Sequence, residues 1–108
     1  MKIAFDVQGT LLGPDKVLKL YKWCEKKGHD LTVWSNCYGY TEDAIKSLSL
    51  GDNAKPMSKV YRLDNNNEDI FDIAVDDKSQ YSELLAAKKI VLVEDIPENE
   101  ELFESIIK

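Results

Sequence analysis

The chain of 108 residues is poor in the residues and segments that mark several classes of protein. It has two cysteines, Cys24 and Cys37, and a single histidine, His29, so it lacks the paired ligand spacing of a zinc site, and we assign His29 no role. Two thiols without a disulfide framework suit a reducing compartment, which favours a cytoplasmic protein. No apolar run approaches the roughly 18 residues of a membrane span, and the N-terminus lacks the pattern of a signal peptide. We therefore expect no zinc module, no disulfide scaffold and no membrane partner.

The chain has fewer basic than acidic residues, which gives it a net charge of −6. Such a charge favours solubility and counts against a nucleic-acid partner, since duplex binding depends on neutralising phosphates. Four lysines gather on one predicted helix, where a solvated helix face is the simpler interpretation: Lys19, Lys22, Lys26 and Lys27. The composition gives no indication of the oligomeric state.

Short apolar segments alternate with helical patterns along the chain. The sequence predicts strands at 2–7, 31–35, 70–75 and 89–94, a further short strand within 55–62, and helices at 15–27, 41–49, 79–87 and 98–107. Alternating strands and helices with short links are typical of a mainly parallel sheet that is covered by helices on both faces. Because this length fits one domain, we predict a single α/β domain over residues 1–108, with a three-layer, Rossmann-like fold.

Three details of the predicted helices concern individual side chains. Cys24 lies on the apolar face of the first helix, so we expect it to pack in the core. Thr41 is the expected N-cap of the second helix. The last helix is expected to face inward through four apolar residues: Leu102, Phe103, Ile106 and Ile107.

Polar side chains end three of the predicted strands. Asp6 ends the first, Ser35 and Asn36 end the second, and Asp76 and Asp77 follow the strand at 70–75. Singly, each has a simpler explanation, such as a turn or a helix cap, but ligands of parallel sheets bind at the carboxyl ends of the strands. Carboxylates that converge there repel one another and need a cation, and hard oxygen ligands suit Mg²⁺. The pattern predicts a metal site at this edge of the sheet.

The same residues resemble the motifs of the haloacid dehalogenase-like (HAD) hydrolases. That family carries Asp-x-Asp-Gly-Thr after the first strand, a Ser or Thr after the second, a Lys, and an acidic pair after the fourth. Here the order is Asp6-Val7-Gln8-Gly9-Thr10, then Ser35 in Val-Trp-Ser-Asn, then Asp76-Asp77 in Ala-Val-Asp-Asp-Lys. The resemblance spans most of the chain. It implies a capless HAD fold and a Mg²⁺-dependent phosphatase that acts through an aspartyl-phosphate.

The resemblance also implies a role for each matching residue. Asp6 would be the nucleophile and a metal ligand, and the main-chain carbonyl of Gln8 would bind the same metal ion. Asp76 and Asp77 would complete the metal shell, either directly or through water. Ser35 would hold the phosphoryl group, with a catalytic part in its transfer.

Further site candidates are less sharply marked. Asn36 and Thr10 are candidate substrate-binding residues beside the matching motifs. Lys59, in Met-Ser-Lys-Val, is the first choice for the family lysine, because that lysine usually follows the third strand, and Lys55 is the second choice. Lys78 lies just past the acidic pair and is expected to be a surface residue.

Gln8 stands where phosphatases of the family have their second Asp, which is the general acid/base. A carboxylic acid can protonate a leaving alkoxide and then take a proton from water, whereas an amide can only donate or accept hydrogen bonds. General acid/base help is typically worth about 10²–10⁴-fold. Gln8 therefore fits a slow phosphatase, a phosphorylated Asp6 that persists, or a site in which another group supplies the proton. Metal binding should survive, because the ligand at position 8 is a main-chain atom.

The chain has no room for a cap domain, since only 28 residues separate Asp6 from Ser35. In the family, an open site tends to accompany large phosphorylated substrates, so a macromolecular substrate fits this chain. Tyr38 and Tyr40 follow Ser35 and could line the rim, where aromatic rings stack on a base or ring, although ordinary loop packing explains them more simply.

Two alternatives remain open. Gln8 also fits a catalytically impaired HAD relative that binds a phosphorylated ligand or a protein partner. A phosphoacceptor receiver domain is a further α/β fold of similar length, but it has its acidic pair after the first strand and its phosphorylated Asp after the third. Here the pair comes late and Gly-Thr follows the first acid, so the order disfavours a receiver domain.

Overall fold

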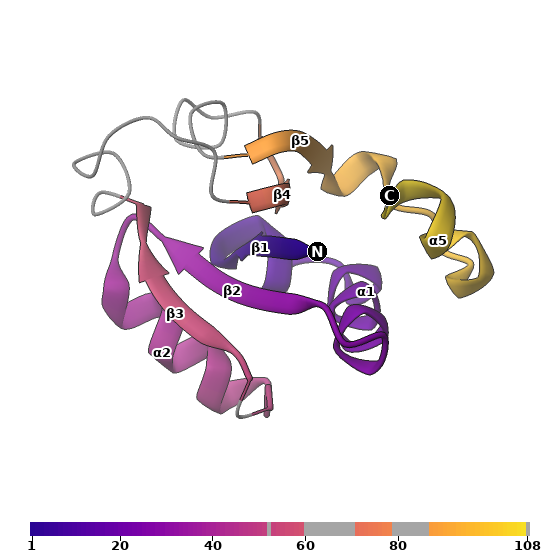
Figure 1. Ribbon diagram of the computed structural model, residues 1–108. Coiled ribbons are helices and arrows are strands. Elements are labelled where there is room, and N and C mark those ends of the chain that lie inside the picture. The colour runs from indigo at the N-terminus through magenta and orange to yellow at the C-terminus, as the bar shows by residue number, and fades with distance from the viewer. Residues whose placement is uncertain (52, 60–70, 79–86, 108) are drawn as a thin grey trace.

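A five-stranded parallel sheet organises the molecule (Figure 1). The computed structural model describes residues 1–51, 53–59, 71–78 and 87–107. The strands are β1 (Lys2–Asp6), β2 (Asp30–Ser35), β3 (Lys55–Ser58), β4 (Phe71–Asp76) and β5 (Ala87–Leu92). The predicted α/β class with a parallel sheet is confirmed, and the short strand expected within 55–62 is β3.

The strand order is β3-β2-β1-β4-β5. The chain builds outward from β1 through β2 to β3, and then returns to the other side of β1 for β4 and β5. The connections that leave β1 and β4 therefore run in opposite directions, which opens a crevice at the carboxyl ends of these two neighbouring strands. The strand order therefore places the last residues of β1 and β4, Asp6 and Asp76, at this crevice.

The described helices are α1 (Asp15–Lys26), α2 (Tyr38–Ser47) and α5 (Phe103–Ile106). Figure 1 shows α2 alongside β2 and β3, against which it packs. Shorter turns are formed by Val7–Leu11, Val93–Asp95 and Glu100–Leu102. No helix in these parts of the chain combines the length and apolar character that crossing a membrane requires.

Several predicted boundaries were wrong. The second helix begins at Tyr38, and Thr41 lies inside it, where its hydroxyl donates to the Tyr38 carbonyl oxygen at 2.6 Å instead of capping the helix. The strand expected at 89–94 is β5, which starts earlier, and Val93–Asp95 already forms a 3₁₀ turn. Of the helix predicted at 79–87, residues 79–86 lie outside the described residues, and Ala87 belongs to β5.

The C-terminal segment departs from the single predicted helix. A 3₁₀ turn at Glu100–Leu102 precedes the short α5. Phe103 and Ile107 are buried as expected, and Ile106 packs partly buried against the core. Leu102 is 51% exposed, so its expected inward orientation was wrong. The change from 3₁₀ to α geometry at this point alters the angular spacing between neighbouring side chains, which the 3.6-residue pattern assumed to be constant.

The sheet buries both of its faces. One face carries the larger core, to which β1 contributes Ile3 and Phe5, and α1, α2 and α5 also contribute to this core. Cys24 is fully buried in it, as predicted, and burial raises the pKa of its thiol to about 12. The other face carries a smaller cluster around one large ring: Ala4, Trp34, Phe71, Ala74 and Ala87, with Met57 against it. The described helices thus cover the first face.

Candidate functional site

The predicted site residues meet at the carboxyl ends of the central strands. Asp6 ends β1, Asp76 ends β4, and Ser35 ends β2, where it lies opposite Ser58 of β3. Lys59 follows β3 directly. A cavity of about 340 Å³ opens at this edge and is lined by Asp6, Gln8, Gly9, Ser35, Asn36, Cys37, Tyr40, Lys59, Asp77 and Lys78. Residues from four separate parts of the sequence therefore share one cavity.

Lys59 joins the two buried acids. Its Nζ lies 2.9 Å from Asp6 Oδ1 and 2.9 Å from Asp76 Oδ2. The Lys59 side chain is 1% exposed, and those of Asp6 and Asp76 are 10% and 0% exposed. A lysine is almost never fully buried unless it is paired, and burying a charge costs more than the pairing returns unless the geometry is good. The ammonium is thus fixed between the two carboxylates.

Lys55 lies elsewhere. It is the first residue of β3, at the amino edge of the sheet, where its Nζ pairs with Asp30 Oδ1 at 2.8 Å. Lys55 and Lys59 are four residues apart on an extended chain, so they occupy opposite edges of the same sheet. The structure brings Lys59 to the site and does not bring Lys55, which was the second choice.

Three carboxylates form a potential cation site. One oxygen from each of Asp6, Asp76 and Asp77 lies within 4.8 Å of the other two. These carboxylates form an all-oxygen donor set, which fits a hard divalent cation such as Mg²⁺. The chemistry of the residues therefore agrees with the metal that the sequence predicts.

The pKa values of two of the three acids are raised. Burial raises the pKa of Asp6 above its usual 3.8, although the charge and hydrogen bond of Lys59 act in the opposite direction. The pKa of Asp77 is also raised, first by a hydrogen bond with Asp76, then by burial and by the Asp76 charge. A bound divalent cation would reverse both shifts, because it stabilises the ionised carboxylates.

Two hydrogen bonds fix the remaining carboxylate oxygens. The Thr10 hydroxyl donates to Asp6 Oδ2 at 3.2 Å, and the Lys78 backbone N–H donates to Asp76 Oδ1 at 3.1 Å. Thr10 is fully buried and does not line the cavity, so its place is behind Asp6 rather than at the predicted substrate position. Lys78 is exposed, as expected, but it also lines the cavity.

Gly9 shapes the turn that carries Gln8. Its φ of +74° lies in the left-handed region, and a Cβ added here would lie 2.5 Å from Asp77 Oδ2. Glycine is therefore favoured for its backbone conformation, and a side chain here would force the exposed Asp77 carboxylate to move. Gln8 itself is exposed at the mouth of the cavity.

The second strand end supplies hydrogen-bonding groups. Ser35 is buried at the base of the cavity, and its Oγ accepts a hydrogen bond from the Cys37 backbone N–H at 3.3 Å. Asn36 lines the cavity as predicted. Tyr40, for which loop packing was the simpler expectation, also lines it and is 46% exposed. Tyr38 lines a neighbouring apolar cavity with Pro56, Met57 and Ser58 instead. Of the two tyrosines, only Tyr40 thus belongs to the candidate site.

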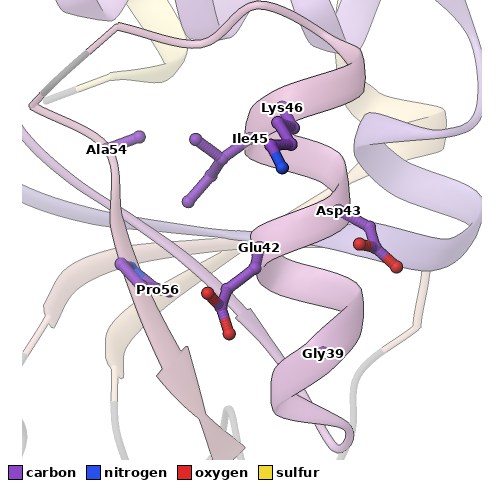
Figure 2. Close-up of a pocket in the computed structure, with 7 residues that line it drawn as sticks. All are labelled: Gly39, Glu42, Asp43, Ile45, Lys46, Ala54 and Pro56. Atoms are coloured by element: carbon purple, nitrogen blue, oxygen red, sulfur yellow. The ribbon is translucent and has the colours of Figure 1, made fainter.

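A second cavity, of about 460 Å³, lies between α2 and β3 and is drawn in Figure 2. Figure 2 shows Glu42 and Ile45 directed from the helix toward the strand, whereas Asp43 points away from it. Its two acids come from one helix, and no third metal-ligating residue joins them in the described part of the chain. The larger cavity therefore lacks the convergence of acids and lysine found at the sheet edge.

Trp34 belongs to the site, although nothing in the sequence pattern distinguishes it from other apolar strand residues. It precedes Ser35 and lies opposite Asp6 in the sheet, and Lys59 Nζ stands over its ring, 5.3 Å from the centroid. The only signal was its place next to Ser35, because the register that sets it beside Asp6 cannot be read from one strand.

Comparison with known proteins gives no match for this chain, whether with protein-family models, with curated protein sequences or with solved structures. The features that bear on function are therefore those of the sheet edge itself: the buried lysine between two acids, the third carboxylate and the cavity.

Proposed function

We propose that this protein is a Mg²⁺-dependent phosphatase of the HAD type, with the three-layer, capless fold of that group, in which Asp6 forms an aspartyl-phosphate. The observation that carries the proposal is the buried Asp6–Lys59–Asp76 arrangement at the carboxyl ends of β1 and β4. It adjoins a cavity that Asp77 and Ser35 also line, and that is open enough for one phosphoryl group of a larger substrate. Order along the chain and position in the sheet both agree with the family's motifs.

Asp6, Asp76 and Asp77 would hold the Mg²⁺ ion, together with the main-chain carbonyl of Gln8. When bound, Mg²⁺ supplies positive charge that balances the carboxylates and the phosphate. The convergence of three carboxylates supports this assignment, because ionised carboxylates this close repel one another and a divalent cation would offset that repulsion.

The reaction uses the chain's own groups as follows. The Asp6 carboxylate attacks phosphorus, the bond between phosphorus and the ester oxygen breaks, and the alcohol leaves as its oxyanion and takes a proton from water. Water then attacks the phosphorus of the aspartyl-phosphate, releasing inorganic phosphate and restoring Asp6. Lys59 places a fixed positive charge beside the attacked phosphoryl group, and the Ser35 hydroxyl donates to one of its oxygens. Gln8 can orient water but cannot exchange a proton with it.

The decisive experiment is hydrolysis of an activated aryl phosphate with and without Mg²⁺, because its leaving group needs little protonation. We expect Mg²⁺-dependent turnover in this chain and its loss in Asp6→Asn. Asp30→Asn is the matched control, because Asp30 is an acid of the opposite sheet edge, and it should keep the activity. Turnover retained by Asp6→Asn would show that Asp6 is not the nucleophile.

Gln8→Asp tests what limits the rate. Restoring a carboxylic acid at this exposed position should raise turnover by about 10²–10⁴-fold on substrates with poor leaving groups, and by less on activated ones. An equal change on both kinds of substrate would argue against a missing general acid.

The alternative function is a phosphorylated-ligand or protein-binding relative, and it is favoured by one observation, the amide of Gln8 at the cavity mouth. It predicts Mg²⁺ binding without turnover in this chain. Turnover that appears only in Gln8→Asp would establish an intact site without its acid, and would favour binding over catalysis.

A further inference from the structure

Trp34 is a large, fully buried side chain that touches the candidate site from beneath. It is the last-but-one residue of β2, and its neighbour across the sheet is Asp6. Lys59 Nζ stands over the indole, 5.3 Å from the ring centroid. On another side, Phe71 meets the indole in an edge-on arrangement, with 4.9 Å between centroids and 75° between planes. The indole thus fills the space between Phe71 and the lysine of the site.

The surroundings leave room for one ring of this size. The other buried members of the cluster on this face, apart from Phe71, are the alanines Ala4, Ala74 and Ala87. Among the described neighbours, the alanines have no side-chain rotamers and Phe71 meets the indole edge-on, which restricts the indole on these sides. Trp34 therefore offers a rigid surface on which a flexible side chain can rest.

The buried indole N–H indicates that packing alone does not explain why position 34 is a tryptophan. Trp34 Nε1 is buried and has no hydrogen-bond partner among the described residues. An unpaired buried donor is unfavourable, and phenylalanine would fill much of the space without one. What tryptophan offers beyond phenylalanine is the stronger attraction of its ring face for a cation. The cation over that face is Lys59.

We propose that Trp34 is a positioning residue of the site, whose indole face holds the Lys59 ammonium between Asp6 and Asp76. The two carboxylates attract the ammonium from the side of the strand ends, and the ring supports it from the sheet face. A lysine has a four-carbon stem with many conformations, so an attraction from the sheet face, added to those of the carboxylates, restricts the ammonium further. The kinetic consequence rests on the proposed function, whereas the placement of Lys59 does not.

The first test measures the placement of Lys59 without using activity. An amine-reactive reagent is applied to the folded chain, and modification of each lysine is followed by mass spectrometry. Lys59 should react slowly, because it is 1% exposed, and Lys55 at 63% should react fast. In Trp34→Leu we expect Lys59 to react at least about tenfold faster. In Trp34→Phe, which keeps a ring face, its protection should largely return.

Phe71→Leu is the matched control. It removes a ring from the same cluster, so it lowers stability, but it leaves the indole beneath Lys59 and should leave the modification rate of Lys59 unchanged. An unchanged rate in folded Trp34→Leu would overturn the proposal. An equal increase in Phe71→Leu would overturn it as well, since general loosening of the cluster would then explain both.

The second test uses the aryl phosphate assay. Trp34→Leu should lower kcat about tenfold with little change in KM, because a misplaced Lys59 charge affects the transition state more than substrate binding. In a Lys59→Met background, the same change should lower kcat no further. An equal loss in that background would show that Trp34 does not act through Lys59. Absence of turnover in the unaltered chain would count against the phosphatase, while the modification test would still decide the placement of Lys59.

Discussion

The two edges of the sheet contain the same ion pair in opposite surroundings. At the carboxyl edge, Lys59 pairs with Asp6 and Asp76 at 2.9 Å, and none of the three side chains is more than 10% exposed. At the amino edge, Lys55 pairs with Asp30 at 2.8 Å, and these side chains are 63% and 42% exposed. The N–O distances of the two ion pairs are alike, so the edges differ in how exposed the paired side chains are to solvent.

Exposure to solvent determines how much each ion pair contributes to stability. An exposed pair is screened by water and contributes about 0–1 kcal/mol, so the amino edge can change with little consequence. A buried pair has lost its water, and removing one partner leaves an uncompensated charge. The amino edge is therefore ordinary surface, whereas the carboxyl edge holds buried charges that depend on one another. This contrast separates a site from a surface more clearly than the residue types do.

The largest expected effect contrasts Lys59→Met with Lys55→Met. Lys59→Met leaves two buried carboxylates without their ammonium and should lower the free energy of unfolding by about 3–5 kcal/mol. Lys55→Met removes an exposed pair and should change it by less than about 1 kcal/mol. Urea unfolding at neutral pH measures both. Similar losses for the two variants would mean that burial does not distinguish the edges.

The same two lysines show how far sequence reasoning reaches. Strand ends and the meeting of Asp6, Ser35 and Asp76 follow from apolar runs that end in polar residues in a parallel sheet, whereas the order of the strands across the sheet was not predicted. The sequence favoured Lys59 over Lys55 as the site lysine only narrowly, because the segment around them has no regular pattern. A shift of four residues along a strand moves a side chain from one edge of the sheet to the other.

Other features depend on contacts that local patterns do not contain. The start of α2 was misplaced because Thr41 is a good N-cap in general, whereas here its hydroxyl bonds to the Tyr38 carbonyl inside the helix. The exposure of Leu102 follows from a 3₁₀ turn that breaks the helical period. The position of Trp34 under Lys59 depends on the register between β1 and β2 and on the path of the chain after β3.

The next expected effect contrasts two glycines, one near each edge. Gly9 and Gly28 have similar positive φ values, +74° and +81°, but a Cβ on Gly28 would meet nothing within 4 Å, whereas one on Gly9 would collide with the Asp77 carboxylate. Gly28→Ala should cost about 1 kcal/mol, the price of the backbone conformation alone. Gly9→Ala should cost about 2–3 kcal/mol, since Asp77 must move as well.

Mg²⁺ binding sharpens this contrast. Displacing the Asp77 carboxylate should weaken Mg²⁺ binding in Gly9→Ala and leave it unchanged in Gly28→Ala, as measured by calorimetry on the folded variants. Equal Mg²⁺ affinities in the two variants would remove Asp77 from the proposed metal shell.

The smallest expected effect is a difference in pH dependence between Asp6 and Asp72. The pKa of Asp72, at the amino edge, is lowered, mainly because its carboxylate accepts a hydrogen bond from the Lys2 backbone N–H. Its contribution to stability is thus present above 3.8, the usual pKa, and is lost as the pH falls below it. The pKa of Asp6 is raised by burial, so the native state holds this proton more tightly than the unfolded state does. Stability should therefore fall as the pH rises above 3.8 through the raised pKa of Asp6, the opposite slope.

Urea unfolding between pH 2.5 and 7, in a chelator and again in Mg²⁺, separates the two acids. In chelator, Asp72→Asn should remove part of the loss of stability below about pH 4. Asp6→Asn should remove part of the fall in stability above that pH. Mg²⁺ favours ionised Asp6, so it should flatten or invert the decline in the unaltered chain while leaving the Asp72 contribution unchanged. If Mg²⁺ left both slopes as they were, the carboxyl edge would be a buried ion pair without a metal, and the contrast between the edges would be one of burial alone.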